Sequence, residues 1–406
     1  MNNIVITRQN NRYLSVLFTE GRPSRMHCSP LLQEEGMLSQ ICLARVKDVI
    51  PAMKGAFLTV PEGRTVYLPL SESGDFLCAN RSFSSLSELH QGDEIVVQIT
   101  GEAVKTKPPL ASAMPVLTGQ YCVCSLFGHG IHVSRKLAQK RQKELKTAIA
   151  EAGIEGRKNF QFTVRTNADT LKELTPLFQE MQEFICFFQE LTEIYRHRSC
   201  PSCLYRPLPE LIRQIQDIPL TAYEEIVTDE SEVWQLLKDT FPEKTVRLYQ
   251  DPSLSLFRLY RLDFFLQEAL SRKVWLSCGG YLVIEPTEAM VVIDVNSGKA
   301  VHKGRSSQDY YRKVNREAAA EIARQLQLRN YSGMIMVDFI NMESEKDQKE
   351  LLSLLDQLLK KDQVRTRLVD MTALGIVEIT RKKSIVRYLK KCRKTLDIHG
   401  SGCYIL

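Results

Sequence analysis

The sequence predicts a multidomain α+β protein in which a strand-rich part precedes an α/β layer. Three observations support this: the 406-residue length exceeds the roughly 150 residues of one domain, strand patterns recur closely over residues 36–118, and strands and helices alternate after about residue 279. Hydrophobic residues make up 44% and charged residues 25%, which excludes a disordered or collagen-like chain. We therefore expect two or three domains with cores of their own.

The N-terminal part reads as short strands. IVITR and RYLSVLFTEG, within residues 1–35, predict a two-stranded hairpin. Between residues 36 and 118 the strand patterns, separated by Gly and Pro, are ICLARVKDVI, GAFLTV, TVYLPL and DEIVVQIT. About five short strands at this spacing predict a small closed barrel such as an OB-fold.

The middle of the chain mixes strands with helices. We expect strands at 121–128 and 159–166, with a charged helix over 135–153 that ends at Gly153. A long amphipathic helix is predicted over 169–198. Its apolar stripe, which we assign to the core, is Leu171, Leu174, Phe178, Met181, Ile185, Phe188 and Tyr195.

The last third has a β-α-β-α-β pattern. The predicted strands are 279–286, 289–298, 331–342, 366–372 and 375–381, and the predicted helices are 306–330 and 346–362. This order predicts an α/β layer, whose strand ends are common places for catalytic side chains.

Two aspartates interrupt apolar strands in this layer. Asp294 and Asp338 are flanked by aliphatic residues on strands predicted to be buried, and Asn296 shares a strand face with Asp294. If the two strands are neighbours, two carboxylates and an amide oxygen converge, which suits Mg²⁺. The alternative is that the aspartates cap helices or pair with arginines. No competing site is evident: the sequence shows no Ser/His/Asp order, no metal-ligand spacing among its histidines and no Walker loop.

Charge is concentrated near the C-terminus. The net charge is only +6, but eight basic residues and no acid lie between positions 381 and 394, beginning with Arg381, Lys382 and Lys383. This segment predicts contact with a polyanion, or alternatively a solvated basic helix.

The barrel offers a second nucleic-acid signal. Phe57 and Tyr67 fall on successive predicted strands, with lysines and arginines nearby. Aromatic faces among basic residues stack the bases of single strands in OB-folds, although half-buried strand aromatics are also common.

Targeting signals and cysteines indicate a cytosolic protein without a membrane span. No apolar run reaches about 18 residues, and Arg8 and Arg12 interrupt any signal-peptide core. Eleven scattered cysteines argue against a secreted disulfide framework. Cys200 and Cys203 form a lone CxxC, a weak zinc signal without a second pair.

Taken together, five segments resemble the ribonuclease E/G family of bacterial endoribonucleases, in that family's order and spacing. They are RVKDVIPAMKGAFLTV, TEAMVVIDVNSGKA, NREAAAEIARQLQLR, SGMIMVDFINM and MTALGIVEITRKK. The resemblance runs over nearly the whole chain. The absence of a long C-terminal scaffold makes the chain more ribonuclease G-like.

The resemblance implies an RNase H-like subdomain split by an insertion and followed by a DNase I-like catalytic subdomain. Its two parts are residues 1–35 and 215–278. The insertion comprises an OB-type RNA-binding domain at 36–118 and a 5′-sensor region at 119–214, and the catalytic subdomain covers 279–406.

The same resemblance implies residue roles. Asp294 and Asp338 match the Mg²⁺-binding aspartates, with Asn296 beside them; Arg165, Thr166 and Arg135 match a 5′-monophosphate pocket; Phe57, Tyr67 and Lys107 match RNA-contacting positions. The implied activity is Mg²⁺-dependent cleavage of single-stranded RNA, favouring 5′-monophosphorylated substrates, in the rRNA maturation and mRNA turnover of a bacterial cytoplasm.

Three departures from the family pattern matter. The usual CPxC zinc-link is missing and only Cys392 and Cys403 remain, which argues against a zinc-linked dimer but leaves a homodimer open. Asn341 stands where the family has an acid, and TKPPLASAMP departs from a TKGA-like stretch. The alternative reading is a non-catalytic RNA-binding protein derived from this family.

Overall fold

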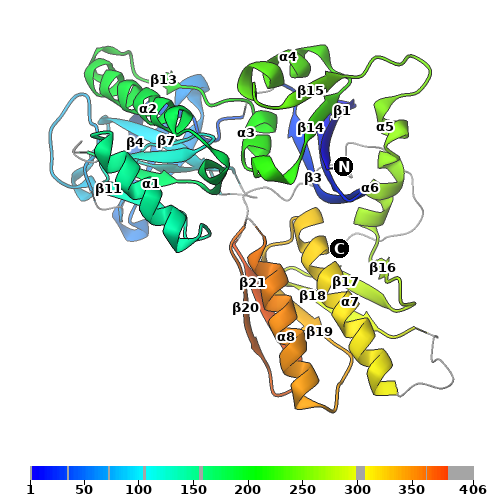
Figure 1. Ribbon diagram of the computed structural model, residues 1–406. Helices are drawn as coiled ribbons and strands as arrows, with labels where there is room; N and C mark the ends of the chain where they lie inside the picture. The colour runs from blue at the N-terminus through cyan, green and yellow to red at the C-terminus, as the bar shows by residue number, and fades with distance from the viewer. Residues whose placement is uncertain are drawn as a thin grey trace. The chain divides into compact units, whose positions relative to one another are not determined.

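The computed structural model describes residues 2–33, 36–71, 74–103, 107–154, 159–298, 307–362 and 364–382. Internal contacts divide the chain into two compact units (Figure 1). The split unit contains residues 1–31 and 222–406, and the inserted unit contains residues 32–221. No helix in the described ranges has the length and apolar character needed to cross a bilayer.

The split unit contains a five-stranded sheet built from both ends of its sequence. In order across the sheet its strands are β15 (Thr245–Leu248), β14 (Glu225–Thr228), β1 (Asn3–Gln9), β2 (Arg12–Thr19) and β3 (Arg22–Pro30). The expected hairpin is confirmed, since β1 and β2 pair antiparallel. The sequence pattern missed β3, which adds a third antiparallel strand beside β2. Its two prolines hid it from the sequence pattern, but β3 is an edge strand, where a missing N–H is tolerated.

Three short helices accompany this sheet: α4 (Ser231–Thr240), α5 (Leu256–Leu259) and α6 (Leu262–Leu270). The core beneath them joins Val5, Leu14 and Val16 of the sheet to Leu262 and Leu266 of α6. One face of β1 and β2 thus packs against α6, and residues on the other face of both strands are buried as well.

The second sheet of the split unit has six strands. Across the sheet they are β16 (Lys273–Trp275), β17 (Tyr281–Pro286), β18 (Met290–Asn296), β19 (Gly333–Asp338), β21 (Ile376–Arg381) and β20 (Thr366–Met371). Only β18 and β19 pair in parallel. Helices α7 (Ser307–Leu328) and α8 (Glu345–Lys360) run side by side along this sheet (Figure 1). They bury Ile293, Val295, Ile335 and Val337, so the predicted α/β layer is confirmed.

The inserted unit contains the predicted barrel. Its strands are β4 (Ile41–Ile50), β5 (Gly55–Thr59), β6 (Thr65–Pro69), β8 (Leu110–Ser112) and β7 (Glu94–Gly101), and β7 closes the circle by pairing with β4. A further strand, β13 (Ser202–Tyr205), pairs with the beginning of β4. The closed five-stranded barrel is confirmed, and it is consistent with an OB-like fold.

A four-stranded sheet completes the inserted unit. Its strands are β11 (Gly130–Val133), β12 (Phe160–Val164), β10 (Cys122–Leu126) and β9 (Val116–Thr118), and its helices are α1 (Gln139–Glu151), α2 (Thr175–Ile194) and α3 (Glu210–Gln216). Helix α2 begins six residues later than expected, because Pro176 in its first turn favours a helix start there. Leu171 and Leu174 consequently precede the helix.

Candidate active site

Asp294 and Asp338 occupy matching positions on neighbouring parallel strands. Asp294 of β18 and Asp338 of β19 are direct partners in the ladder. Partner residues of adjacent strands point to the same sheet face, so the two carboxylates lie side by side. The condition set from the sequence, that the two strands be neighbours, is met.

The carboxylates lie on the open face of the sheet. Along β18 the residues alternate between buried and exposed, with Ile293 and Val295 under the helices and Asp294 exposed; Asp338 is exposed as well. The expectation that these strands are buried therefore holds for one face of the sheet only. The physical reason is that α7 and α8 cover only one face, so every second residue meets solvent.

The surroundings of the pair suit a cation. Asn296 donates its Nδ2 hydrogen to Asp294 Oδ2 at 2.7 Å. Within the described part of the chain, no lysine or arginine forms an ion pair with Asp294 or Asp338. The capping alternative fails for Asp338, because Ser344 caps α8.

These oxygens fit Mg²⁺, which binds proteins through one or two carboxylates and keeps several waters. The described residues hold no cluster of three or more His, Cys, Asp or Glu side chains. A site here would therefore rest on two carboxylates and the neighbouring amide, a donor set for a hard cation rather than for a zinc-like ion.

Helix α7 holds the chain segments that follow both aspartates. Tyr310 donates its hydroxyl to the Ser297 carbonyl at 2.9 Å, just beyond β18. Asn315 donates to the Ile340 carbonyl at 2.8 Å and accepts from the Ile340 amide at 3.1 Å, just beyond β19. Neither residue was predicted from the sequence. The available signal in the sequence was an asparagine beside Val314 and one turn from Ala318 and Ala319, apolar residues of the helix.

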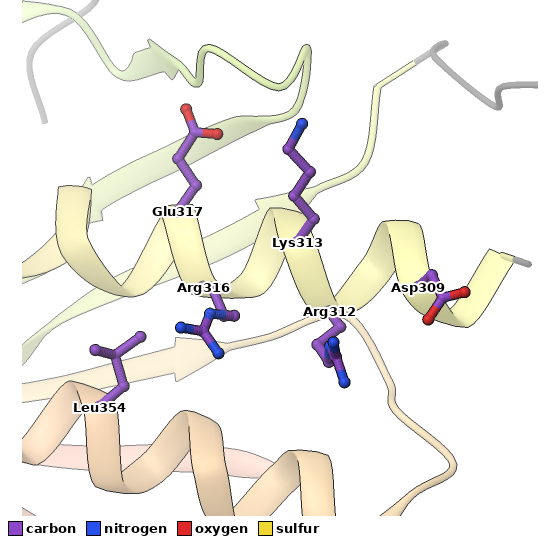
Figure 2. A pocket seen from close by; sticks show the side chains of 6 residues that line it. All are labelled: Asp309, Arg312, Lys313, Arg316, Glu317 and Leu354. Atoms are coloured by element: carbon purple, nitrogen blue, oxygen red, sulfur yellow. The ribbon is translucent and has the colours of Figure 1, made fainter. Parts of the chain in front are cut away.

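A groove lined mainly by charged side chains lies along the same helix, with one lining residue from α8. Figure 2 shows its lining, which is Asp309, Arg312, Lys313, Arg316, Glu317 and Leu354, around a volume of about 750 Å³. This groove is on the helix-covered side of the sheet, whereas the carboxylate pair is on the open face. It contains none of the predicted site residues, so we do not place the chemistry there.

Phe57 and Tyr67 form an aromatic pair on the barrel. They are ladder partners on β5 and β6, half-buried, with ring centroids 5.7 Å apart. The Tyr67 ring passes over Gly55, where any Cβ would overlap it, and its hydroxyl donates to the Met53 carbonyl at 3.1 Å. Lys107 is exposed and shortly precedes the residue that pairs with Tyr67.

The predicted phosphate-binding residues gather at one sheet edge. Strands β11 and β12 are parallel, with Val133 opposite Val164. Arg135 and the pair Arg165 and Thr166 follow these two strand ends, so all three lie at the same edge. Arg135 is exposed, while Arg165 and Thr166 are half-buried.

Arg165 is already engaged by protein groups. Its Nη2 lies 2.6 Å from Asp217 Oδ1, and its Nη1 donates to the Gly119 carbonyl. The loop that carries Gly119 is held by Glu180, which accepts from the amides of residues 120, 121 and 122 at 2.5–2.9 Å. Burial raises the pKa of Glu180, although these amides act against the rise. The sequence carried no signal for Asp217 or Glu180.

The basic segment is described only at its beginning. Arg381 is 4% exposed and forms an ion pair with Asp362 at 2.7 Å, so its guanidinium is engaged inside the fold. Lys382 is exposed. Lys383, Cys392, Cys403 and the rest of the segment lie outside the described residues.

Within the described residues, no third His, Cys, Asp or Glu side chain joins the CxxC pair in a cluster that could hold a metal ion. Cys203 is the ladder partner of Cys42 on β4. Burial raises the pKa of Cys42 to about 12 and that of Cys200 to about 11, so both thiols are protonated at neutral pH.

The structure defines a multidomain α/β protein. Its inserted unit contains a closed OB-like barrel, and its split unit carries an exposed carboxylate pair on a six-stranded sheet. A model described as the Ribonuclease E/G family matches residues 116–384. The chain belongs to this family, which confirms the resemblance seen in its sequence.

Individual relatives agree with this assignment. A protein named ribonuclease E from Synechocystis sp. is 31% identical over 85% of this chain and 52% of its own length. Ribonuclease G from Salmonella typhimurium is 30% identical over 90% of this chain and 77% of its own length. A chloroplastic ribonuclease E/G-like protein from Arabidopsis thaliana is 29% identical over 81% of this chain and 35% of its own. The chain thus spans about half the length of the ribonuclease E relatives it matches.

Proposed function

We propose that this chain is an endoribonuclease that hydrolyses single-stranded RNA in RNA processing and decay, using Mg²⁺ held by Asp294 and Asp338. The observation that carries the proposal is the register of β18 and β19, which sets two carboxylates side by side on an open sheet face. An open face admits an extended strand of RNA. The names of the relatives, ribonuclease E and ribonuclease G, support the same activity.

The side chains of the site have separate tasks in this proposal. Asp294 and Asp338 hold the cation, and Asn296 fixes the orientation of Asp294 through its 2.7 Å hydrogen bond. When bound, Mg²⁺ supplies positive charge that stabilises the phosphoryl transition state and activates the attacking water. Tyr310 and Asn315 keep the two strand ends in place. Cleavage would leave a 5′-phosphate and a 3′-hydroxyl.

Other described residues support recognition of single-stranded RNA. The Phe57 and Tyr67 rings offer stacking surfaces to bases, and exposed Lys107 offers charge to phosphates. We further propose that Arg135, Arg165 and Thr166 form a pocket for a 5′-monophosphate, since a guanidinium fork beside a hydroxyl suits a terminal phosphate. Because Arg165 is ion-paired with Asp217, an incoming phosphate must displace the Asp217 carboxylate or share the guanidinium with it.

The test is cleavage of a 5′-monophosphorylated oligoribonucleotide by wild type, Asp294→Asn and Asp338→Asn. The matched control is Glu285→Gln, which removes an exposed carboxylate from the neighbouring strand of the same sheet. We expect both aspartate variants to lose cleavage by at least about a hundredfold while the control retains it. Undiminished cutting by both aspartate variants would sink the assignment. Wild type that binds RNA but never cuts it with Mg²⁺ or Mn²⁺ would favour the non-catalytic alternative.

A further inference from the structure

Trp275 presents an exposed indole on the open face of the six-stranded sheet. It is the last residue of β16 and is 65% exposed, although the residues on either side of it, Val274 and Leu276, are only 3% and 6% exposed. Alternation along the strand therefore directs the indole away from the core. A large aromatic side chain held in solvent by a regular strand is a candidate binding surface.

Two neighbours extend the indole into a cluster. Tyr281 is the ladder partner of Trp275, and the two ring centroids are 5.2 Å apart at an interplanar angle of 59°. Lys273 lies on the same strand face as Trp275, and its Nζ is 4.0 Å from the Trp275 centroid and 3.6 Å from the Tyr281 centroid. This aromatic platform, Lys273, Trp275 and Tyr281, thus combines two rings with one positive charge.

The platform continues directly into the carboxylate site. Tyr281 is the ladder partner of Asn296, the residue that binds Asp294. Since neighbouring strands are about 4.8 Å apart, the Trp275 backbone lies about 10 Å from that of Asn296 on the same face. This span allows a base one or two nucleotides from the cut bond to reach the indole.

The platform is also held rigidly. The turn between β16 and β17 is bound by Glu317 of α7, which accepts from the amides of Ser277 and Cys278. Burial alone would raise the pKa of Glu317, but the hydrogen bonds of Cys278 and Ser277 lower it, so the carboxylate stays charged. Gly280 is required beside this turn, because a Cβ there would lie 2.8 Å from the Asn296 carbonyl oxygen. The platform is therefore ordered before a ligand binds, so less conformational entropy is lost on binding.

We propose that the aromatic platform stacks a nucleobase of the single-stranded RNA while Lys273 contacts an adjacent phosphate. The inference rests on the proposed function, since it names a further substrate contact of the same site. The charge of this face favours RNA over a protein as the molecule that binds it. A protein docked here would bury the exposed Asp294 and Asp338 carboxylates without a cation, which is costly. An RNA strand leaves these oxygens for a metal ion and brings both a π face and a phosphate.

The experiment measures binding separately from cleavage. Affinity for a labelled single-stranded oligoribonucleotide is determined by fluorescence anisotropy with chelator present, so that no bond is cut. Trp275→Ala is compared with Trp275→Phe and with Phe264→Ala, a control that removes another exposed aromatic carrying an arginine over its ring. Stacking on a single base predicts about tenfold weaker binding by Trp275→Ala, partial rescue by Trp275→Phe and no change in the control.

A second readout follows the indole itself. The chain has two tryptophans, so Trp234→Phe leaves Trp275 as the sole reporter. We expect RNA to quench its fluorescence, and an abasic ribose at one RNA position to abolish both the quenching and the tenfold advantage over Trp275→Ala. Equal affinity of wild type and Trp275→Ala, with unquenched fluorescence and normal cleavage, overturns the platform but leaves the nuclease proposal standing. Wild type that binds no RNA overturns both.

Discussion

Replacing Arg381 by alanine separates two roles for this residue. The sequence places Arg381 at the start of a basic segment that is predicted to contact RNA, whereas its side chain is only 3% exposed and that of Asp362 only 2%. Its guanidinium donates to Asp362 at 2.7 Å, to Asn330 Oδ1 at 2.8 Å and to the Tyr331 carbonyl at 2.9 Å. We therefore expect Arg381→Ala to damage the fold rather than the binding of RNA.

The size of the effect follows from the partner left behind. Removing one member of a buried ion pair costs about 3–5 kcal/mol, because the remaining charge is neither solvated nor paired. With a urea dependence of about 2–3 kcal/mol per molar, the unfolding midpoint should fall by about 1–2 M. The double variant Arg381→Leu with Asp362→Leu should recover much of this loss, since neither charge remains.

The assay pairs urea unfolding with RNA affinity measured at several salt concentrations. Exposed Lys382 is the matched control: Lys382→Ala should leave the unfolding midpoint unchanged. If Lys382 contacts a phosphate, its loss lowers the slope of log affinity against log salt by about 0.7. A normal midpoint together with a reduced salt slope in Arg381→Ala would refute the structural role and restore the one predicted from the sequence.

Two further predictions concern the 5′ pocket and pH. Arg165→Ala should abolish any preference for 5′-monophosphate over 5′-hydroxyl RNA. Asp217→Asn should raise that preference several-fold, because it frees the Arg165 guanidinium for the phosphate. A lower ratio of the two cleavage rates in Asp217→Asn would contradict competition between Asp217 and the phosphate for Arg165. Burial, aided by the charges of Arg25 and Arg381, lowers the pKa of His27 to about 3, so between pH 6.5 and 3 the unfolded chain binds a proton that the folded chain does not. Stability should therefore fall with acidification by up to about 5 kcal/mol from this residue, and His27→Gln should show a smaller loss between pH 7 and pH 4 in urea titrations; an identical pH dependence would count against this reasoning.

Local patterns predicted most strands and helices correctly, because alternation and helical periodicity reflect which face is buried. Helices α7 and α8, five of the six strands in the second sheet and four of the five barrel strands follow their patterns, whereas the three-residue strands β16 and β8 were not predicted. The failures have local causes. Prolines hid β3, which an edge position tolerates, and Pro176 moved the start of α2 beyond Leu174.

The candidate site was predictable only in part. Asp294, Asn296 and Asp338 stand out because polar groups interrupt apolar strands. A shared pocket for Arg135 and Arg165 was implied by family resemblance alone, and only the structure places them at one sheet edge. Partners distant in sequence had no such signal. Asp217 beside Arg165 is one of them.

By itself the sequence determined the family, the residue types of the carboxylate site and the strand pattern that carries them, since these depend on composition and short-range periodicity. Tertiary structure alone decided which residues meet. It set Asp294 opposite Asp338 on an open face, buried Arg381 against Asp362, and placed Trp275 beside the site. The physical reason is that strand register and one-sided helix packing arise from contacts between segments far apart in the chain, and no local pattern encodes them.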